Sequence, residues 1–176
     1  MLGSVARSVG IAIFFFLLLG LAYPLAETGI GQAAFSQQAN GSLGANGSTL
    51  VGQQWKGPKW FQGRPDADNP MTTGGSNLGP RSKVLATDVA RQVSVLKKEG
   101  ITPTPDLVTT SGSGVDPDIA PVDAYAQVNA VAKARGLPVA TVRGLVASMI
   151  QQPELGFLGS QYIDVLQLNQ RLARLR

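Results

Sequence analysis

The sequence predicts an α+β protein with one membrane-spanning helix near its N-terminus and a single mixed, helix-rich extracytoplasmic domain after it. The run Val9–Ala26 is apolar and free of charge, whereas the chain after Glu27 is polar and rich in Gly, Ser, Asn and Gln. Apolar residues in the later part recur at the three- and four-residue spacings of helices, and only short runs suit strands.

The run Val9–Ala26 has the length of a membrane span, because a helix of that length covers about 27 Å. Arg7 precedes the run and Glu27 follows it, so the positive-inside rule places the N-terminus in the cytoplasm. The expected domains are a cytoplasmic N-terminus at residues 1–8, a transmembrane helix at residues 9–27 and an extracytoplasmic domain at residues 28–176.

A cleaved signal peptide is the alternative to a retained anchor. Its cleavage site would lie near Gln32–Phe35. Signal peptides have a shorter apolar region than Val9–Ala26, which favours retention. Under both interpretations the rest of the chain is exported.

The composition excludes several classes of site. Cysteine and histidine are both absent, which removes disulfides, thiolate and imidazole metal ligands, and hydrolases of the Ser-His-Asp type. The net charge of +4 is mild and its basic residues are scattered. We therefore expect that the protein binds neither a metal nor a nucleic acid and that it associates with a membrane.

The first elements expected after the anchor are short strands and a loop. Gly63–Arg81 is dense in Gly, Pro, Asn and Asp but neither repetitive nor highly charged, which predicts an ordered loop. The expected strands are Thr49–Trp55, Trp60–Phe61 and Leu107–Thr110.

Four helices are expected in the same domain, three of them from amphipathic spacing. Gly100 ends the first, Asp123 caps the second and Gly136 ends it, and Pro138 opens the third at a first-turn position. Three of these helices have a predicted apolar face, and for the second of them it is expected to be buried; the faces are Leu85, Val89, Val93 and Leu96; Val139, Val142, Val146 and Met149; and Val165, Leu168, Leu172 and Leu175.

The run Ser111–Gly114 is the strongest candidate for contact with an anion or a nucleotide. Successive backbone N–H groups in such a Ser-Gly-Ser-Gly run can form a concave nest for negative charge. The run is short and contains no lysine, so an ordinary turn is the default interpretation.

Other sequence patterns that resemble catalytic or metal-binding motifs are incomplete. Ser94–Lys97 matches the Ser-x-x-Lys pattern of penicillin-interacting enzymes, but no Lys-Thr-Gly follows it. Neither Asp66 with Asp68 nor Asp116 with Asp118 has the Gly and distal Glu of an EF-hand loop. Aspartates beside proline favour turns instead.

A series of phrases, in a fixed order, resembles one family. The likeness begins with the anchor that ends in Tyr23–Pro24. It continues through Gln38–Ser42, Leu50–Gln53, Phe61–Pro65, Gly74–Leu78, Leu107–Gly114, Asp116–Ile119, Gln127, Val131–Arg135, Leu158–Gly159 and Val165–Asn169. Each phrase is weak alone, but their order and spacing are specific. The chain resembles the KdpC family, whose members belong to the potassium-transporting P-type ATPase.

The resemblance implies an accessory, non-catalytic subunit of the high-affinity, ATP-driven potassium uptake complex in the bacterial inner membrane. The implied partners are a channel-like subunit that selects potassium, a P-type ATPase subunit and a small membrane peptide. The implied roles are assembly and catalytic chaperoning, which raises the ATP affinity of the ATPase subunit. An exported enzyme or small-ligand-binding domain on the same anchor is the alternative.

Within the family, the chaperone role is tied to the stretch that corresponds here to Ser111, Gly112, Ser113 and Gly114. The expected topology places this stretch outside the cell, away from cytosolic ATP. We therefore expect no firmly bound cofactor in this chain, and an effect on ATP that acts indirectly through the partner subunit.

Candidate contacts with partner subunits come from the anchor, the aromatic cluster and the family phrases. Gly10 and Gly20 permit the close approach of another helix. Trp55, Trp60 and Phe61 either belong to the core or form a patch that meets another protein. The remaining candidates are Gln62, Arg64, Asn77 and Gln127.

Overall fold

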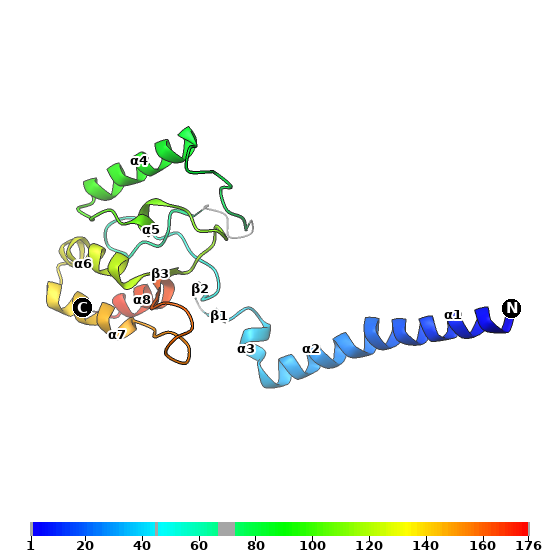
Figure 1. Ribbon diagram of the computed structural model, residues 1–176. Helices are drawn as coiled ribbons and strands as arrows, with labels where there is room; N and C mark the ends of the chain where they lie inside the picture. The colour runs from blue at the N-terminus through cyan, green and yellow to red at the C-terminus, as the bar shows by residue number, and fades with distance from the viewer. Residues whose placement is uncertain (1, 45, 67–72, 176) are drawn as a thin grey trace. The chain divides into compact units, whose positions relative to one another are not determined.

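The computed structural model of the chain describes residues 2–44, 46–66 and 73–175 (Figure 1). These residues divide into two compact units, residues 1–43 and residues 44–176. The set of elements agrees with the predicted class: one long apolar helix, and a domain with many helical residues and short strands.

One long helix dominates the N-terminal unit. It is continuous through α1 (Leu2–Leu17), the π-helical segment η1 (Leu18–Ala22) and α2 (Tyr23–Ala34). Of all the helices described, it alone is long and apolar enough to cross a membrane. The apolar run Val9–Ala26 lies inside it, and the helix continues into less apolar residues at both ends.

The π-helical segment has a local cause in the sequence. Pro24 has no N–H and so cannot donate to a carbonyl in the preceding turn. The N–H of Tyr23 donates to the carbonyl of Leu18, five residues back, in the wider turn that defines a π-helix. Local π adjustments of this kind are one way in which membrane helices accommodate proline.

Short elements connect this helix to the C-terminal unit and begin that unit. They are α3 (Ser36–Ala39), β1 (Leu43–Gly44) and β2 (Gly47–Ser48). The larger elements that follow are α4 (Lys83–Lys98), α5 (Pro105–Val108), β3 (Asp118–Ile119), α6 (Pro121–Arg135), α7 (Val139–Met149), β4 (Ile163–Asp164) and α8 (Val165–Leu172).

The main core lies where α6, α7 and α8 pack together, and Figure 1 shows these helices gathered away from α4. β3 and β4 pair in antiparallel register beside them, with Asp118 opposite Asp164 and Ile119 opposite Ile163. A smaller apolar cluster joins α4 and α5 to α6. It consists of Leu96, Ile101, Leu107 and Ala130.

The four predicted helices are confirmed as α4, α6, α7 and α8. Gly136 ends α6 in the left-handed conformation, with φ of 67°. Asp164 caps α8 by accepting the N–H of Gln167 at 2.7 Å. The apolar period was a sufficient signal for α4, α7 and α8, whereas α6 was predicted from Asp123 and from the glycine that ends it.

Details of three helices differ from the prediction. Asp123 lies in the first turn of α6 and not at its cap, because Pro121 begins the helix; its carboxylate accepts the N–H of Ala120 at 3.0 Å. Val139 is 44% exposed, because it is the first residue of α7 and lies at the edge of the core, and Pro138 precedes the helix. α8 ends before Leu175.

The three predicted strands are wrong. Thr49–Trp55 and Trp60–Phe61 have no strand assignment, and Leu107–Thr110 begins inside the short helix α5. Pro105 opens α5 at a first-turn position, where its fixed φ favours a helix. The loop predicted at residues 63–81 has neither helix nor strand where it is described, and residues 67–72 lie outside the described residues.

Two buried side-chain amides replace the missing strand partner of Phe61 and Gln62. Asn169 on α8 accepts the N–H of Phe61 at 2.9 Å and donates to its carbonyl at 2.8 Å. Gln127 on α6 accepts the N–H of Gln62 at 2.7 Å and donates to its carbonyl at 2.9 Å. Both amides are fully buried. This arrangement, called here the amide clamp, satisfies buried backbone groups that a β-ladder would otherwise satisfy.

Replacing Asn169 with leucine tests the amide clamp. Asn169→Leu leaves the N–H and the carbonyl of Phe61 without partners, which should lower the free energy of unfolding by about 2–4 kcal/mol. Urea denaturation of the full chain in detergent measures the change. Gln170→Leu, one residue along α8 and without a side-chain hydrogen bond to the described residues, is the control, and we expect about 0.5 kcal/mol or less. Equal losses in both variants would contradict the role given to Asn169.

The register of β3 and β4 places two carboxylates side by side. Asp164 is buried at 6% exposure and holds the cap of α8. Burial raises the pKa of Asp118 to about 6, with further contributions from the negative charges of Asp164 and Asp116. The folded state therefore binds a proton at Asp118 more strongly than the unfolded chain does.

Because its pKa is raised, Asp118 lowers the free energy of unfolding at neutral pH. This destabilisation should decrease as the pH falls through 6 and should level off below the ordinary pKa of 3.8. Asp118→Asn removes the buried charge. At pH 7.5 we expect the variant to be more stable than the natural chain by about 1 kcal/mol, after allowance for solvent screening. The advantage should shrink to near zero at pH 4. Urea denaturation across this pH range measures it, and a difference independent of pH would contradict the prediction.

Candidate functional site

The Ser-Gly loop, residues Ser111 to Gly114, is bound by a carboxylate of the same chain. Asp66 Oδ1 accepts the N–H of Ser111 at 2.7 Å. Asp66 Oδ2 accepts the hydroxyl of Ser111 at 2.7 Å and the N–H of Asp116 at 2.9 Å. The negative charge expected at a backbone nest is thus already supplied from within the domain.

Serine hydroxyls occupy further N–H groups around the loop. The hydroxyl oxygen of Ser111 accepts the N–H of Gly114 at 2.8 Å, and that of Ser113 accepts the N–H of Val115 at 3.2 Å. Ser111 is 8% exposed. These contacts are those of an ordered turn, which agrees with the default interpretation of the sequence.

The backbone of residues 74–75 packs directly on the Ser-Gly loop. The N–H of Gly74 donates to the carbonyl of Ser113 at 2.6 Å. Gly114 has φ of 70°, and a Cβ on it would lie 2.5 Å from the carbonyl oxygen of Gly74. Only glycine fits both the conformation and the close approach.

Arg64 fixes the segment that carries Asp66. Its guanidinium forms an ion pair with Asp106 at 2.8 Å and donates to the carbonyl of Thr110 at 3.1 Å. It also lies 3.3 Å from the hydroxyl of Thr109. Arg64 therefore ties the segment before Asp66 to the residues immediately before the Ser-Gly loop.

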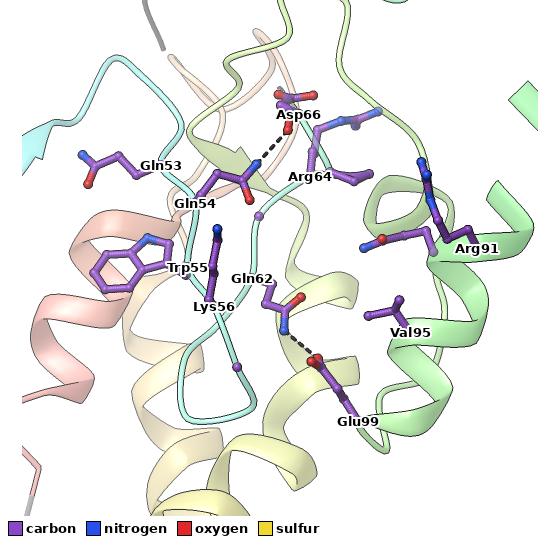
Figure 2. A pocket seen from close by; sticks show the side chains of 14 residues that line it. Gln53, Gln54, Trp55, Lys56, Gln62, Arg64, Asp66, Arg91, Val95 and Glu99 are labelled. Carbon is purple, nitrogen blue, oxygen red and sulfur yellow. Dashed lines mark hydrogen bonds between the residues drawn. The ribbon is translucent and has the colours of Figure 1, made fainter. Parts of the chain in front are cut away.

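A polar cleft of about 580 Å³ lies between residues 53–66 and α4 (Figure 2). Gln54 donates to the backbone carbonyl of Asp66 at 2.7 Å, and Gln62 donates at 2.6 Å to Glu99, the residue that follows α4. Ser111 to Gly114 do not line this cleft. Its charged lining residues are Lys56, Arg64, Asp66, Arg91 and Glu99.

The cleft offers polar contacts from amide, carboxylate and basic side chains. Among the described residues, no serine, threonine or tyrosine hydroxyl lines it, and no group of three or more acidic side chains is gathered that could hold a metal. Elsewhere, the hydroxyl of Ser94 donates to the carbonyl of Ala90 in its own helix at 2.9 Å. Asp116 accepts the N–H of Asp118 at 3.0 Å, as expected for a turn, and Asp68 lies outside the described residues.

The predicted partner contacts occupy different environments. Trp55 and Trp60 are partly buried, with their ring centres 5.0 Å apart, and the guanidinium of Arg135 lies 5.0 Å from the Trp60 ring. Phe61 and Gln127 are fully buried inside the domain. Their side chains are therefore not exposed to a partner in this structure.

The other candidates lie nearer the surface. Gln62 and Arg64 line the cleft with Trp55. Asn77 is exposed with φ of 55°. Gly10 and Gly20 are exposed on the N-terminal helix, with open space where a Cβ would lie. Their contacts with a partner remain predictions.

Sequence reasoning missed the residues that organise the site, namely Asp66, Asn169, Glu99 and Asp106. A weak signal existed for Asn169, which is an amide next to the buried positions Leu168 and Leu172 of an amphipathic helix. Asp66 follows a proline and resembles any turn aspartate, so no local signal shows that it binds a loop about 45 residues away.

Asp66→Asn tests the role of the carboxylate. An amide provides one acceptor oxygen where Asp66 uses two, and it carries no charge, so we expect a loss of about 1.5–3 kcal/mol in the free energy of unfolding. Amide hydrogen exchange should accelerate at Ser111 and Asp116. Asp88→Asn, which removes an exposed ion pair with Arg91, is the control and should cost about 0.5 kcal/mol or less. Unchanged exchange at both amides would contradict the prediction.

Similarity to known proteins extends over nearly the whole chain. Residues 5–174 match the family described as "K+-transporting ATPase, c chain". A protein from Caulobacter vibrioides named "Potassium-transporting ATPase KdpC subunit" is 45% identical over 170 residues, which cover 90% of this chain and 86% of that protein. Proteins of the same name from Rhodopseudomonas palustris and Sorangium cellulosum are 46% and 48% identical, covering 87% and 86% of this chain and 88% and 87% of their own lengths. The chain therefore belongs to the KdpC family of potassium-transporting ATPase subunits.

Proposed function

We propose that this chain is the accessory, non-catalytic subunit of a high-affinity, ATP-driven potassium uptake complex. The observation that carries the proposal is the family match over residues 5–174, because the relatives are named as subunits of a potassium-transporting ATPase. The polar cleft is large enough for a small ligand, which favours a ligand-binding domain as the second candidate.

The proposed partners are a channel-like subunit that selects potassium, a P-type ATPase subunit and a small membrane peptide. The long apolar helix supports membrane anchoring within such a complex. Arg7 before the apolar run and Glu27 after it favour a cytoplasmic N-terminus and an extracytoplasmic main domain in the inner membrane.

The proposed chaperone role is indirect. An extracytoplasmic domain has no access to cytosolic ATP, and Asp66 already occupies N–H groups of the Ser-Gly loop. The subunit would raise the ATP affinity of the ATPase subunit by favouring the conformation that binds ATP more tightly, which is a coupling between distant sites.

Co-purification tests the subunit assignment. A tagged chain extracted from its native membranes in mild detergent should bring a P-type ATPase subunit and a channel-like subunit with it. Recovery of the chain alone would reject the assignment and leave the ligand-binding candidate.

Cysteine labelling tests the orientation, because the natural chain contains no cysteine. Ser4→Cys and Ser160→Cys each introduce one thiol at an exposed position on either side of the apolar run. A membrane-impermeant maleimide should label Ser160→Cys in cells with an intact inner membrane and Ser4→Cys only after permeabilisation. The opposite pattern would overturn the orientation and allow direct contact with ATP.

ATP titration of the purified complex tests the indirect role. Coupling energies of the usual size predict that complexes without this subunit bind ATP about 5–150-fold more weakly. Ser113→Ala in the Ser-Gly loop should change the affinity by less than about twofold, because the loop does not contact ATP in this proposal. A loss in Ser113→Ala as large as that on removing the subunit would show direct binding.

A further inference from the structure

The segment between α7 and β4 carries an exposed apolar tip. Leu155, Phe157 and Leu158 are 81%, 73% and 52% exposed. Figure 1 shows this segment as the orange loop that projects beside α7. Other large apolar side chains exposed on the domain, such as Val84 and Val122 at the starts of α4 and α6, stand singly along the chain. A cluster of such residues at a loop tip is the kind of surface that marks an interaction site.

Hydrogen bonds hold the tip in one conformation. At its base, Gln151 and Tyr162 exchange backbone bonds of 2.9 and 3.3 Å. Nearer the tip, Glu154 and Leu158 exchange bonds of 3.0 and 2.9 Å. A loop that is already ordered loses little conformational entropy when it binds, so its exposed side chains are prepared for contact.

Leu155 occupies a backbone conformation that leucine normally avoids. Its φ is +53°, in the left-handed region, where glycine has no steric penalty and asparagine has a small one. The side chain is 81% exposed, so packing inside the domain does not offset the strain of this conformation. Residues held in such sparsely populated backbone conformations cluster at functional sites.

The charge around the tip distinguishes a protein partner from a lipid surface. No lysine or arginine occurs between Arg143 and Arg171, and the exposed Glu154 lies in the tip, in a chain whose net charge is +4. Binding to a membrane surface relies on basic residues beside the apolar ones. The exposed carboxylate of Glu154 instead fits an apolar pocket with a neutral or basic rim.

We propose that Leu155, Phe157 and Leu158 form an anchor that inserts into an apolar pocket on a partner protein subunit, with a basic group of that subunit near Glu154. This inference rests on the proposed function, in that it requires the chain to be part of a complex. Beyond that function, it specifies which surface of this chain makes the contact and which chemistry the contact has. Phe157 supplies the large aromatic side chain that is enriched at the centre of interfaces.

Substitutions at the tip separate assembly from folding. Leu155→Gly removes the side chain and also the strain, so the Tm of the free subunit should change by no more than about 4 °C. The double variant, which carries Leu155→Gly and Phe157→Ser, should bind the purified partner subunits at least about tenfold more weakly than the natural chain. Val122→Ser removes a 62% exposed side chain from the start of α6 and should leave binding unchanged within about twofold. Binding unchanged in the double variant, with the natural complex intact, would overturn this inference and leave the proposed function standing.

Crosslinking locates the occupant of the tip. Phe157→Cys and Val122→Cys, each the single thiol of its chain, are coupled to a short photo-crosslinker in the assembled complex. We expect Phe157→Cys to crosslink to a partner subunit and Val122→Cys to give little product. Crosslinks only to lipid, or only to a second copy of this chain, would overturn the inference. Failure of the natural chain to form any complex would instead reject the proposed function.

Discussion

The structure of the C-terminal unit depends on the amide clamp. Asn169 and Gln127 are fully buried, and burial of an unpaired amide is costly. Each side chain offsets this cost by pairing with both polar groups of one backbone residue, Phe61 or Gln62. Because the two amides come from α8 and α6, the clamp fixes a loop segment against two helices of the core. Removing either amide would leave the N–H and the carbonyl of its backbone residue buried without hydrogen-bond partners.

The position of the Ser-Gly loop follows from this clamp through a short chain of contacts. Arg64 lies two residues after Gln62 and pairs with Asp106 and the carbonyl of Thr110. Asp66 follows and binds Ser111. The same segment lines the polar cleft. A core substitution such as Asn169→Leu would therefore affect the loop at a distance, although it touches none of the loop residues.

The helices could be predicted from the sequence because their signals are local. The apolar periods of α4, α7 and α8, the glycine after α6 and the uncharged run of the anchor are all signals within or next to the elements they describe. The extended segments could not be assigned, because Phe61 and Gln62 pair with side chains from α8 and α6 and not with a strand. Asp66 was missed as an organising residue for the same reason: its partners lie far along the chain. Family membership was evident from the ordered phrases, while the exposed tip at Leu155 required the backbone angle and the exposure.

The contact between Asp66 and the Ser-Gly loop also determines how the loop responds to anions in solution. Asp66 belongs to the same chain and acts as an internal ligand, whose effective concentration at the loop does not depend on protein concentration and is at least about millimolar. A free phosphate or carboxylate would have to exceed that concentration, and would have to displace a carboxylate that already sits 2.7 Å from the Ser111 N–H. The N–H groups of Ser111 and Asp116 are therefore already occupied within the domain, and a free anion would have to compete with Asp66 for them.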